Sequence, residues 1–80
     1  MWVFDTTIES LCHGTDLKVP GISKVNDKIN KDERVAIMSL KDELVALGIA
    51  QMNSEEMLGE KGLAVRTDKV FMKPGTYKIL

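Results

Sequence analysis

The stretch that decides the fold is His13-Gly14-Thr15-Asp16-Leu17-Lys18-Val19-Pro20-Gly21-Ile22. Gly14 can adopt the left-handed backbone conformation that ends a helix. The residue before Pro20 is disfavoured from helical geometry, so the chain there is extended. Pro20 and Gly21 suit a turn or a bulge, where Gly21 lets another backbone or a ligand come close. The stretch predicts a helix end, a loop with free backbone donors and a departing strand. That geometry fits either a phosphate- or nucleotide-binding loop or a plain connector.

The residues before this stretch predict a strand and a short helix. Residues 2–4 (Trp-Val-Phe) are of the aromatic and β-branched types that strands favour. Thr6 and Glu9 have the spacing of a capping box. We therefore predict a helix over residues 7–13, ended by Gly14. At helical spacing its apolar residues fall on one face, which we expect to be buried: Ile8, Leu11 and Cys12.

Residues 34–52 allow two interpretations. They are rich in good helix formers, which favours one long helix. Their apolar residues, however, scatter around the whole circumference of such a helix, whereas a surface helix needs an apolar stripe. Two strands, over residues 35–38 and 44–50 with a tight turn at 41–43, fit this pattern better. The residues alone favour the hairpin and leave the helix open.

The remaining segments predict short strands and turns. Residues 17–19 and 21–25 are extended, with a turn at 26–28. Residues 53–58 predict a second short helix, capped by Ser54 and ended by glycines. Strands over 62–66 and 69–72 change phase, which predicts a bend, a bulge or a turn at Thr67-Asp68. A further turn at Pro74-Gly75 precedes residues 77–80, a last strand or a frayed end. The predicted class is mainly β (α+β), in the order β-α-β-β-β-β-α-β. Such short strands usually close into a barrel.

Composition limits the function classes. The chain has 80 residues, which indicates a single domain over 1–80, and its net charge of -1 gives no global basic field for nucleic acid. One cysteine, Cys12, excludes an internal disulfide and fits a reducing cytoplasm. No apolar run is long enough for a membrane span. The abrupt start with a strand suggests a domain excised from a longer protein.

Several motifs in this order resemble the PUA domain, the RNA-binding module named for pseudouridine synthases and archaeosine transglycosylases. The resemblance runs from about Trp2 to Met72. It is carried by the residues at 10–22, with their helix-glycine-small-polar-hydrophobic-Pro-Gly signature, and by those at 35–38, 44–52, 54–57, 62–65 and 69–72. Within the family, the chain is most similar to the C-terminal PUA domain of archaeal dyskerin-like, guide-RNA-directed (H/ACA) pseudouridine synthases.

This resemblance implies a six-stranded pseudobarrel with two short helices, and it decides in favour of the hairpin. It also implies that RNA lies against the first helix, the glycine loop and the last strand. Carried over, the RNA-binding residues are Gly14, Thr15, Asp16, Leu17, Lys18, Pro20 and Gly21 on one side, and Arg66, Lys69, Phe71 and Lys73 within residues 66–73 on the other. The implied partners are the ACA box and lower stem of an H/ACA guide RNA, or a tRNA acceptor end, together with the catalytic domain of a pseudouridine synthase. Neither DNA nor a membrane is expected as a partner.

The physical roles follow from side-chain chemistry. The lysines and Arg66 would neutralise phosphates, and Leu17, Pro20 and Phe71 would offer apolar surface to an unstacked base. Each of these residues has a plainer interpretation as a solvated charge or a core residue. Two other function classes stay open: a free-standing PUA protein in translation or ribosome biogenesis, and a protein-docking module without RNA contact.

An enzyme is a weaker interpretation of the sequence. Cys12 and His13 are adjacent, so their side chains diverge on a helix and do not face each other. Asp16 and the Glu55-Glu56 pair lack a second partner, a phosphate loop or metal-ligand spacing. We therefore expect no catalytic residue, no metal and no cofactor.

Overall fold

The computed structural model describes residues 1–73 and 75. Six strands, one α-helix and two 3-10 turns (η) follow one another in these residues: β1 (Trp2–Val3), α1 (Asp5–Cys12), β2 (Leu17–Lys18), η1 (Val19–Gly21), β3 (Ile22–Lys24), β4 (Arg34–Met38), β5 (Leu44–Ala50), η2 (Glu56–Leu58) and β6 (Leu63–Val70). The predicted class and strand order are confirmed, with a 3-10 turn in place of the second helix.

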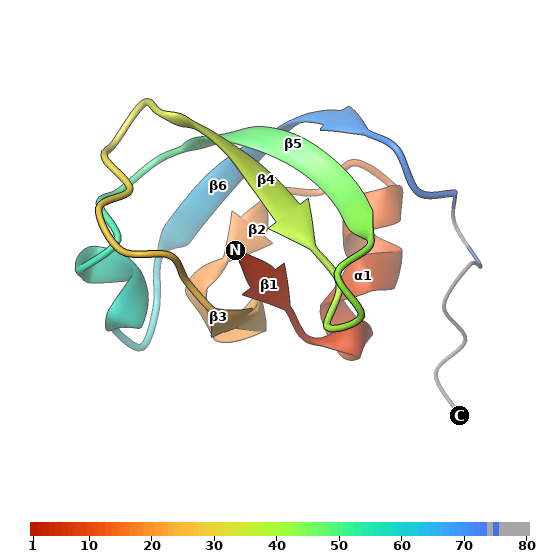
Figure 1. Ribbon diagram of the computed structural model, residues 1–80, viewed down its shortest axis with the longest axis horizontal. Helices are drawn as coiled ribbons and strands as arrows, with labels where there is room; N and C mark the ends of the chain where they lie inside the picture. Colours follow the sequence, from red (N-terminus) through yellow and green to blue (C-terminus); the bar gives the residue numbers. More distant parts are fainter. Residues whose placement is uncertain (74, 76–80) are drawn as a thin grey trace.

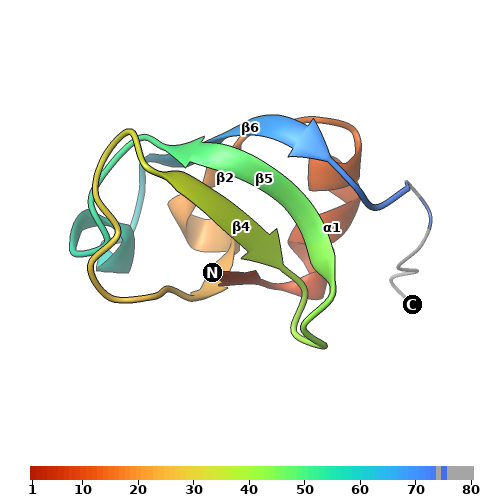
Figure 2. The ribbon, with the colours of Figure 1, turned by 45° about the horizontal axis from the view of Figure 1, so that its top comes forward.

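The strands form one sheet that curls into a pseudobarrel (Figures 1 and 2). Their order across the sheet is β2-β6-β5-β4-β1-β3. The β1–β4 pair is parallel, and the other pairs are antiparallel. The two outer strands, β2 and β3, are separated along the chain only by the turn η1. The edges of the sheet therefore come close together, with a seam at η1 in place of a closing hydrogen-bonded pair.

Strands β4 and β5 form the hairpin that the sequence favoured over a long helix. Their register pairs Arg34 with Ile49 and Ala36 with Leu47. The tight turn between them is made possible by Asp42, which has a φ of 62°. Strand β5 lies between β4 and β6, and its residue Val45 is fully buried. Strand β4 alternates exposed and buried residues, and β5 has adjacent buried residues at Val45 and Ala46, so neither strand gives the apolar stripe of a helix.

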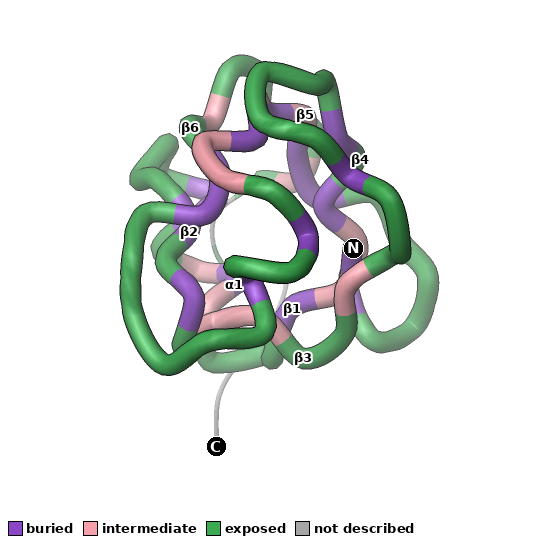
Figure 3. Tube along the Cα trace, turned by 90° about the vertical axis from the view of Figure 1, so that its left-hand side faces the viewer, coloured by how far each residue is buried: buried purple, intermediate pink, exposed green. Residues whose placement is uncertain are grey.

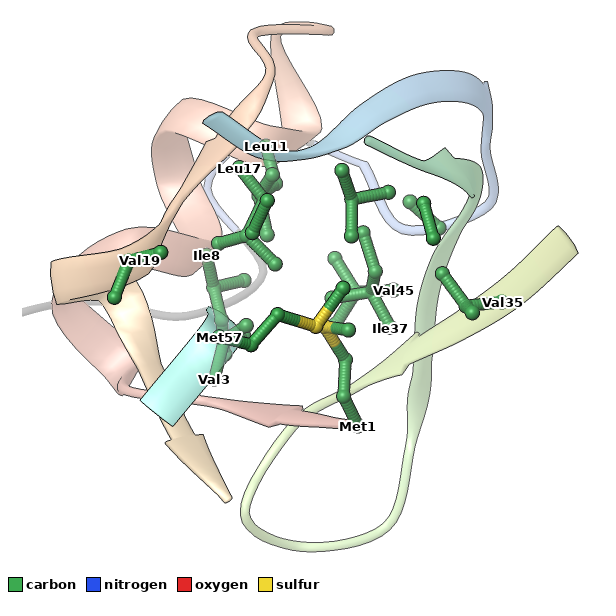
Figure 4. Close-up of a cluster of buried hydrophobic side chains, with 14 of the residues drawn as sticks. Met1, Val3, Ile8, Leu11, Leu17, Val19, Val35, Ile37, Val45 and Met57 are labelled. Atoms are coloured by element: carbon green, nitrogen blue, oxygen red, sulfur yellow. The ribbon is translucent and has the colours of Figure 1, made fainter. Parts of the chain in front are cut away.

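The core fills the inside of the curled sheet. Figure 3 shows buried segments on β1, β2, β4 and β5 facing a common interior. Side chains from α1 and from the sheet meet there, as the close-up in Figure 4 shows. The largest fully buried residues are Ile8, Leu11, Leu17, Ile37, Val3, Val45 and Val65. The predicted inner face of the first helix is confirmed, because Ile8, Leu11 and Cys12 are all buried.

Helix α1 begins earlier than predicted, and the expected capping box is absent. The N-cap is Phe4, which makes no side-chain capping hydrogen bond. The entry is set instead by a tertiary contact, since the Phe4 N–H donates to the Gly21 carbonyl at 3.1 Å. The Thr7 hydroxyl also donates to that carbonyl, at 3.3 Å. Asp5 lies in the first turn, where a carboxylate interacts favourably with the helix dipole.

The second predicted helix is wrong in type and length. Only Glu56–Leu58 is helical, as a 3-10 turn, and Ser54 does not cap it. Ser54 is buried, and its N–H donates to the Ile29 carbonyl at 2.9 Å. Asn53 holds the start of the segment, because its Oδ1 accepts the Lys31 N–H at 2.8 Å. Gly59 follows directly after Leu58, at the end of the 3-10 turn. Few residues remain in which a helix could propagate.

The two predicted C-terminal strands are one continuous strand, β6, that contains the predicted bulge. The β5–β6 register changes between Leu47–Lys69 and Gly48–Thr67, which leaves Asp68 without a paired residue in β5. Sequence alternation thus located the irregularity and mistook it for a break in the strand. Of the last predicted features, residue 74 of the Pro74-Gly75 turn and residues 77–80 lie outside the described part of the chain.

Candidate nucleic-acid interface

The glycine loop after α1 is built by a Schellman motif. Gly14 has a φ of 86°, in the left-handed region. Its N–H donates to the Leu11 carbonyl at 2.9 Å, and the Thr15 N–H donates to the Ser10 carbonyl at 3.3 Å. These bonds satisfy carbonyls at the helix end that would otherwise lack partners. The role predicted for Gly14 as a helix terminator is confirmed, and the loop leaves α1 in a defined direction.

The loop is attached to β6 at the bulge. The Thr67 N–H donates to Asp16 Oδ1 at 3.1 Å, and the Thr67 hydroxyl donates to the Thr15 carbonyl at 2.8 Å. The Thr15 hydroxyl in turn donates to the Ser10 carbonyl at 2.7 Å. The loop is therefore in direct contact with the last strand at this point. These hydrogen bonds leave no open groove between the loop and the strand at Thr67.

A shallow depression of about 400 Å³ lies on the other side of the loop, between α1 and the β2–η1 segment. It is lined by Thr6, Thr7, Ser10, Thr15, Asp16, Lys18 and Gly21. Its lining contains one ammonium group, one carboxylate and four hydroxyl groups, so it offers hydrogen-bonding groups with little net charge. Such a surface can receive a nucleotide whose phosphate lies towards Lys18 and whose sugar or base meets the hydroxyls.

Of the seven predicted N-terminal residues, four line this depression, Leu17 lies in the core, and Gly14 and Pro20 are exposed outside the lining. Thr15, Asp16, Lys18 and Gly21 line the depression. Leu17 is fully buried, so the prediction that its side chain offers apolar surface to a base is wrong. It points inward because β2 alternates, with Leu17 buried and Lys18 exposed.

Position 21 has no room for a side chain, because α1 lies directly against Gly21. A Cβ at this position would come within 2.8 Å of Thr7 Oγ1 and 2.9 Å of Thr7 Cγ2. Gly21 is therefore closely approached, but the approaching group is the Thr7 side chain of α1, whereas the prediction was another backbone or a ligand. Pro20 is exposed next to Gly21, at the start of η1.

The C-terminal group of predicted residues forms a second, separate surface on and after β6. Arg66, Lys69 and Phe71 are exposed, and Phe71 retains 46% of its accessible surface. Lys69 Nζ lies 5.2 Å from the centre of the Phe71 ring. Lys73 is exposed two residues further on. Cations beside an accessible ring can hold a phosphate near a stacked base, but none of these residues lines the depression.

The sequence prediction missed three residues that line the depression, and it included Thr67 only within the range 66–73, without a role. Thr6, Thr7 and Ser10 line the depression, and Thr67 attaches the loop to β6. A signal for the first three exists, because Ser10 follows Thr6 by four residues and Thr7 by three, and residues at these spacings are neighbours on a helix surface. Thr67 leaves no such signal, since it meets Thr15 only through the pairing of distant strands.

A larger hollow of about 610 Å³ lies elsewhere, between residues 27–30 and 53–55. Its charged lining consists of Asp27, Glu55 and Lys28. Two carboxylates against one ammonium disfavour a polyanion there. The depression beside α1 is therefore the better candidate for nucleic acid.

Cys12 and His13 do not form a nucleophile–base pair. The Cys12 side chain is buried, 8% exposed, whereas His13 is exposed and its Nε2 lies 3.3 Å from Glu9 Oε1. Burial, and secondarily the nearby Glu9 carboxylate, raises the pKa of the Cys12 thiol. Among the described residues, no group of three or more His, Cys, Asp or Glu side chains could hold a metal ion. No helix in that part of the chain is long and apolar enough to cross a membrane.

Cys12 is expected to react slowly with iodoacetamide in the folded protein. A raised pKa keeps the thiol protonated to higher pH, and the thiolate is the species that reacts. Mass spectrometry over time at mildly alkaline pH measures the rate, and the same chain unfolded in urea is the control. Equal rates in the two states would contradict a buried, protonated Cys12.

Comparison with known proteins identifies the family. The family model of the PUA domain matches residues 1–71, nearly all of the chain that forms the pseudobarrel. The chain belongs to the PUA domain family. The family expected from the resemblance is thus confirmed.

The PUA domain is similar in sequence to parts of longer archaeal proteins. It is 54% identical over 78 residues to the probable tRNA pseudouridine synthase B of Thermococcus onnurineus, covering 96% of this chain and 23% of that protein. The corresponding protein of Pyrococcus furiosus is 51% identical over 78 residues, again with 96% and 23% covered. The chain thus spans about a quarter of the length of these synthases, and most of their length has no counterpart in it.

Solved structures show the same relation in three dimensions. The PUA domain superposes with a TM-score of 0.94 and 51% identity on a chain of an H/ACA RNP bound to a substrate RNA containing 2'-deoxyuridine, covering 96% of this chain and 25% of that one. For the Nop10–Cbf5 complex of an archaeal box H/ACA sRNP the TM-score is 0.93 at 50% identity, with 99% and 26% covered. A PUA domain protein from Thermoplasma acidophilum is more distant, with a TM-score of 0.84 and 29% identity, and 92% and 48% covered.

Proposed function

We propose that this PUA domain is an RNA-binding module that positions structured RNA for RNA modification such as pseudouridine synthesis. The RNA is either the ACA box and lower stem of an H/ACA guide RNA or the acceptor end of a tRNA. The observation that carries the proposal is the hydroxyl-lined depression with Lys18 at its side, in a domain closely similar to parts of pseudouridine synthases. The domain contributes binding, and the catalytic domain of a synthase is its proposed partner in the cytoplasm.

The charge distribution supports a modest, salt-dependent interaction. The net charge is -1, so attraction to RNA has to come from local cations. Lys18 lies at the depression, and Arg66, Lys69 and Lys73 lie on and after β6. The Asp16 carboxylate disfavours a phosphate directly beside it, so the backbone of the RNA is expected to approach Lys18 while Asp16 faces sugar or base donors. The exposed Phe71 ring offers a stacking surface for an unpaired base.

A titration with RNA tests the proposal. The probe is a hairpin with a 3′ single-stranded ACA tail, followed by fluorescence anisotropy at low and at physiological salt. We expect binding at low salt that weakens as salt is raised, and weaker binding of a hairpin with a changed tail or of its DNA counterpart. No binding at low salt, or binding indifferent to salt, would contradict the proposal.

Lys18→Ala should weaken this binding roughly fivefold, the effect of losing an interaction of about 1 kcal/mol. The slope of log affinity against log salt should also become shallower, by about 0.7–0.9 for one lost phosphate contact. Lys31→Ala is the matched control, because it removes the same charge from an exposed residue that does not line the depression. Equal losses for the two variants would indicate attraction by net charge without a site.

The alternative, a protein-docking module, rests on the exposed large hydrophobic side chains. Phe4, Leu40, Leu44 and Phe71 are between 39% and 51% exposed. Leu44 and Phe71 are near each other, since the Phe71 N–H donates to the carbonyl of Val45 at 2.9 Å. Dimerisation of the isolated chain in sedimentation experiments, without RNA binding, would favour this alternative.

A further inference from the structure

The pairing of β2 with β6 is short. It joins Lys18 with Leu63 and Leu17 with Val65, and there the ladder ends. Beyond this ladder, β6 has its bulge at Asp68, which has no opposite residue in β5, and the bulge interrupts the regular pairing of β6. The next contact between these segments is made by side chains: Asp16 Oδ1 accepts the Thr67 N–H at 3.1 Å, and Thr67 Oγ1 donates to the Thr15 carbonyl at 2.8 Å. Beyond the backbone ladder, hydrogen bonds that involve the Asp16 and Thr67 side chains therefore hold the loop against β6.

The contact extends from β6 to α1 through the loop. Thr67 holds Thr15 and Asp16, and the Thr15 hydroxyl donates to the Ser10 carbonyl at 2.7 Å. We call these three hydrogen bonds the Thr67 latch. Ser10, Thr15 and Asp16 all line the depression, and Thr67 does not. The latch therefore fixes the position of the loop residues that form one wall of the depression, although Thr67 itself lies outside the depression.

The three hydrogen bonds of the latch are exposed to solvent. Their effect on the position of the loop can therefore differ from their effect on the free energy of unfolding. An exposed hydrogen bond exchanges readily for one with water, so its net contribution to global stability is small. The same hydrogen bond has a larger effect on the conformation of the loop, because a hydrogen bond to water in its place would not hold the loop in one position. Binding surfaces need their groups held in place before the ligand arrives.

We infer that Thr67 is a positioning residue for RNA: its hydroxyl and its backbone N–H hold the loop wall of the depression in the binding geometry. The inference rests on the proposed RNA-binding function. It gives a specific role to a residue that the sequence prediction did not single out and that lies on a different element from the depression.

Thr67→Val and Thr67→Ser test the inference as a pair. Valine keeps the β-branched shape and removes the hydroxyl donor, whereas serine keeps the donor and removes a methyl group. Thr67→Val should lower the affinity for the hairpin with the ACA tail about fivefold, the effect of one lost hydrogen bond, with little change in the midpoint of thermal unfolding. Thr67→Ser should bind within about twofold of the unchanged protein. Amide hydrogen exchange at Thr15 and Asp16 should be faster in Thr67→Val.

Asp16 offers a second arm, because asparagine keeps an oxygen acceptor for the Thr67 N–H and alanine does not. Asp16→Ala should bind more weakly than Asp16→Asn. The loss in the double variant Asp16→Ala, Thr67→Val should be smaller than the product of the single losses, because both variants release the same loop.

Several outcomes overturn the inference alone: unchanged binding by Thr67→Val, an equal loss in Thr67→Ser, or equal binding by Asp16→Ala and Asp16→Asn. Each leaves RNA binding by the unchanged protein intact, so the proposed function stands. Absence of binding by the unchanged protein at low salt overturns the proposed function, and the role of Thr67 falls with it.

Discussion

Gly48→Ala is expected to destabilise the protein by about 3 kcal/mol, typical of a side chain forced into a filled interior. Gly48 lies on β5 opposite the β6 bulge, paired with Thr67. An added Cβ would overlap Val65 Cγ1 and lie 2.7 Å from the Arg66 carbonyl oxygen. Val65 is fully buried and the Arg66 oxygen is backbone, so neither can move without shifting β6. The midpoint of thermal unfolding, followed by circular dichroism, should fall by roughly 12–24 °C for a domain of this size.

Gly14→Ala is the matched control for that substitution. Gly14 has a φ of 86°, but a Cβ there would meet no atom within 4 Å. The expected cost is therefore the backbone strain alone, about 1–2 kcal/mol. If Gly48→Ala costs no more than Gly14→Ala, the close approach of β5 and β6 at the bulge is not as rigid as the geometry indicates.

Leu17→Ala is expected to destabilise the protein by about 3–5 kcal/mol, as for other large-to-small changes in a core. Leu17 is fully buried on β2 and belongs to the cluster shown in Figure 4. Removing its side chain loses apolar burial and leaves a cavity beside Ile8 and Leu11. Unfolding in urea measures the free energy of unfolding, and the midpoint should fall without a large change in slope.

Leu17→Met separates this core role from an RNA contact. A change that nearly conserves volume should cost less than about 1.5 kcal/mol. Both Leu17 variants should bind the hairpin with near-normal affinity when they are folded, in contrast to Lys18→Ala. A Leu17→Ala protein of normal stability that had lost RNA binding would restore the interpretation that Leu17 contacts a base.

Local sequence signals located most of the elements. Gly14 marked the end of α1 because few other residues adopt its backbone conformation without strain. The change of alternation before Val70 located the bulge at Thr67-Asp68, since a strand cannot change faces without an extra residue. The buried helix face at Ile8, Leu11 and Cys12 followed from spacing alone.

Two predictions failed where distant parts of the chain decided the outcome. The start of α1 is set by the contact between Phe4 and Gly21, and no capping pattern within the helix reports that contact. The helix expected near Ser54 is only a 3-10 turn, because Asn53 and Ser54 are held by the segment that contains Ile29 and Lys31. Propensity describes a segment in isolation, and tertiary hydrogen bonds override it.

The sequence by itself determined the strand-rich class, the order of the elements, the glycine that ends α1 and the position of the bulge, because each depends on residues near one another along the chain. Only the tertiary structure decided which predicted site residues share a surface. In the tertiary structure the Leu17 side chain points into the core, and Asp16 accepts a hydrogen bond from the Thr67 N–H. The tertiary structure also separated the depression beside α1 from the cations on and after β6. The reason is physical: the pairing of β2 with β6 joins residues about fifty positions apart, and no local pattern encodes the register of such a contact.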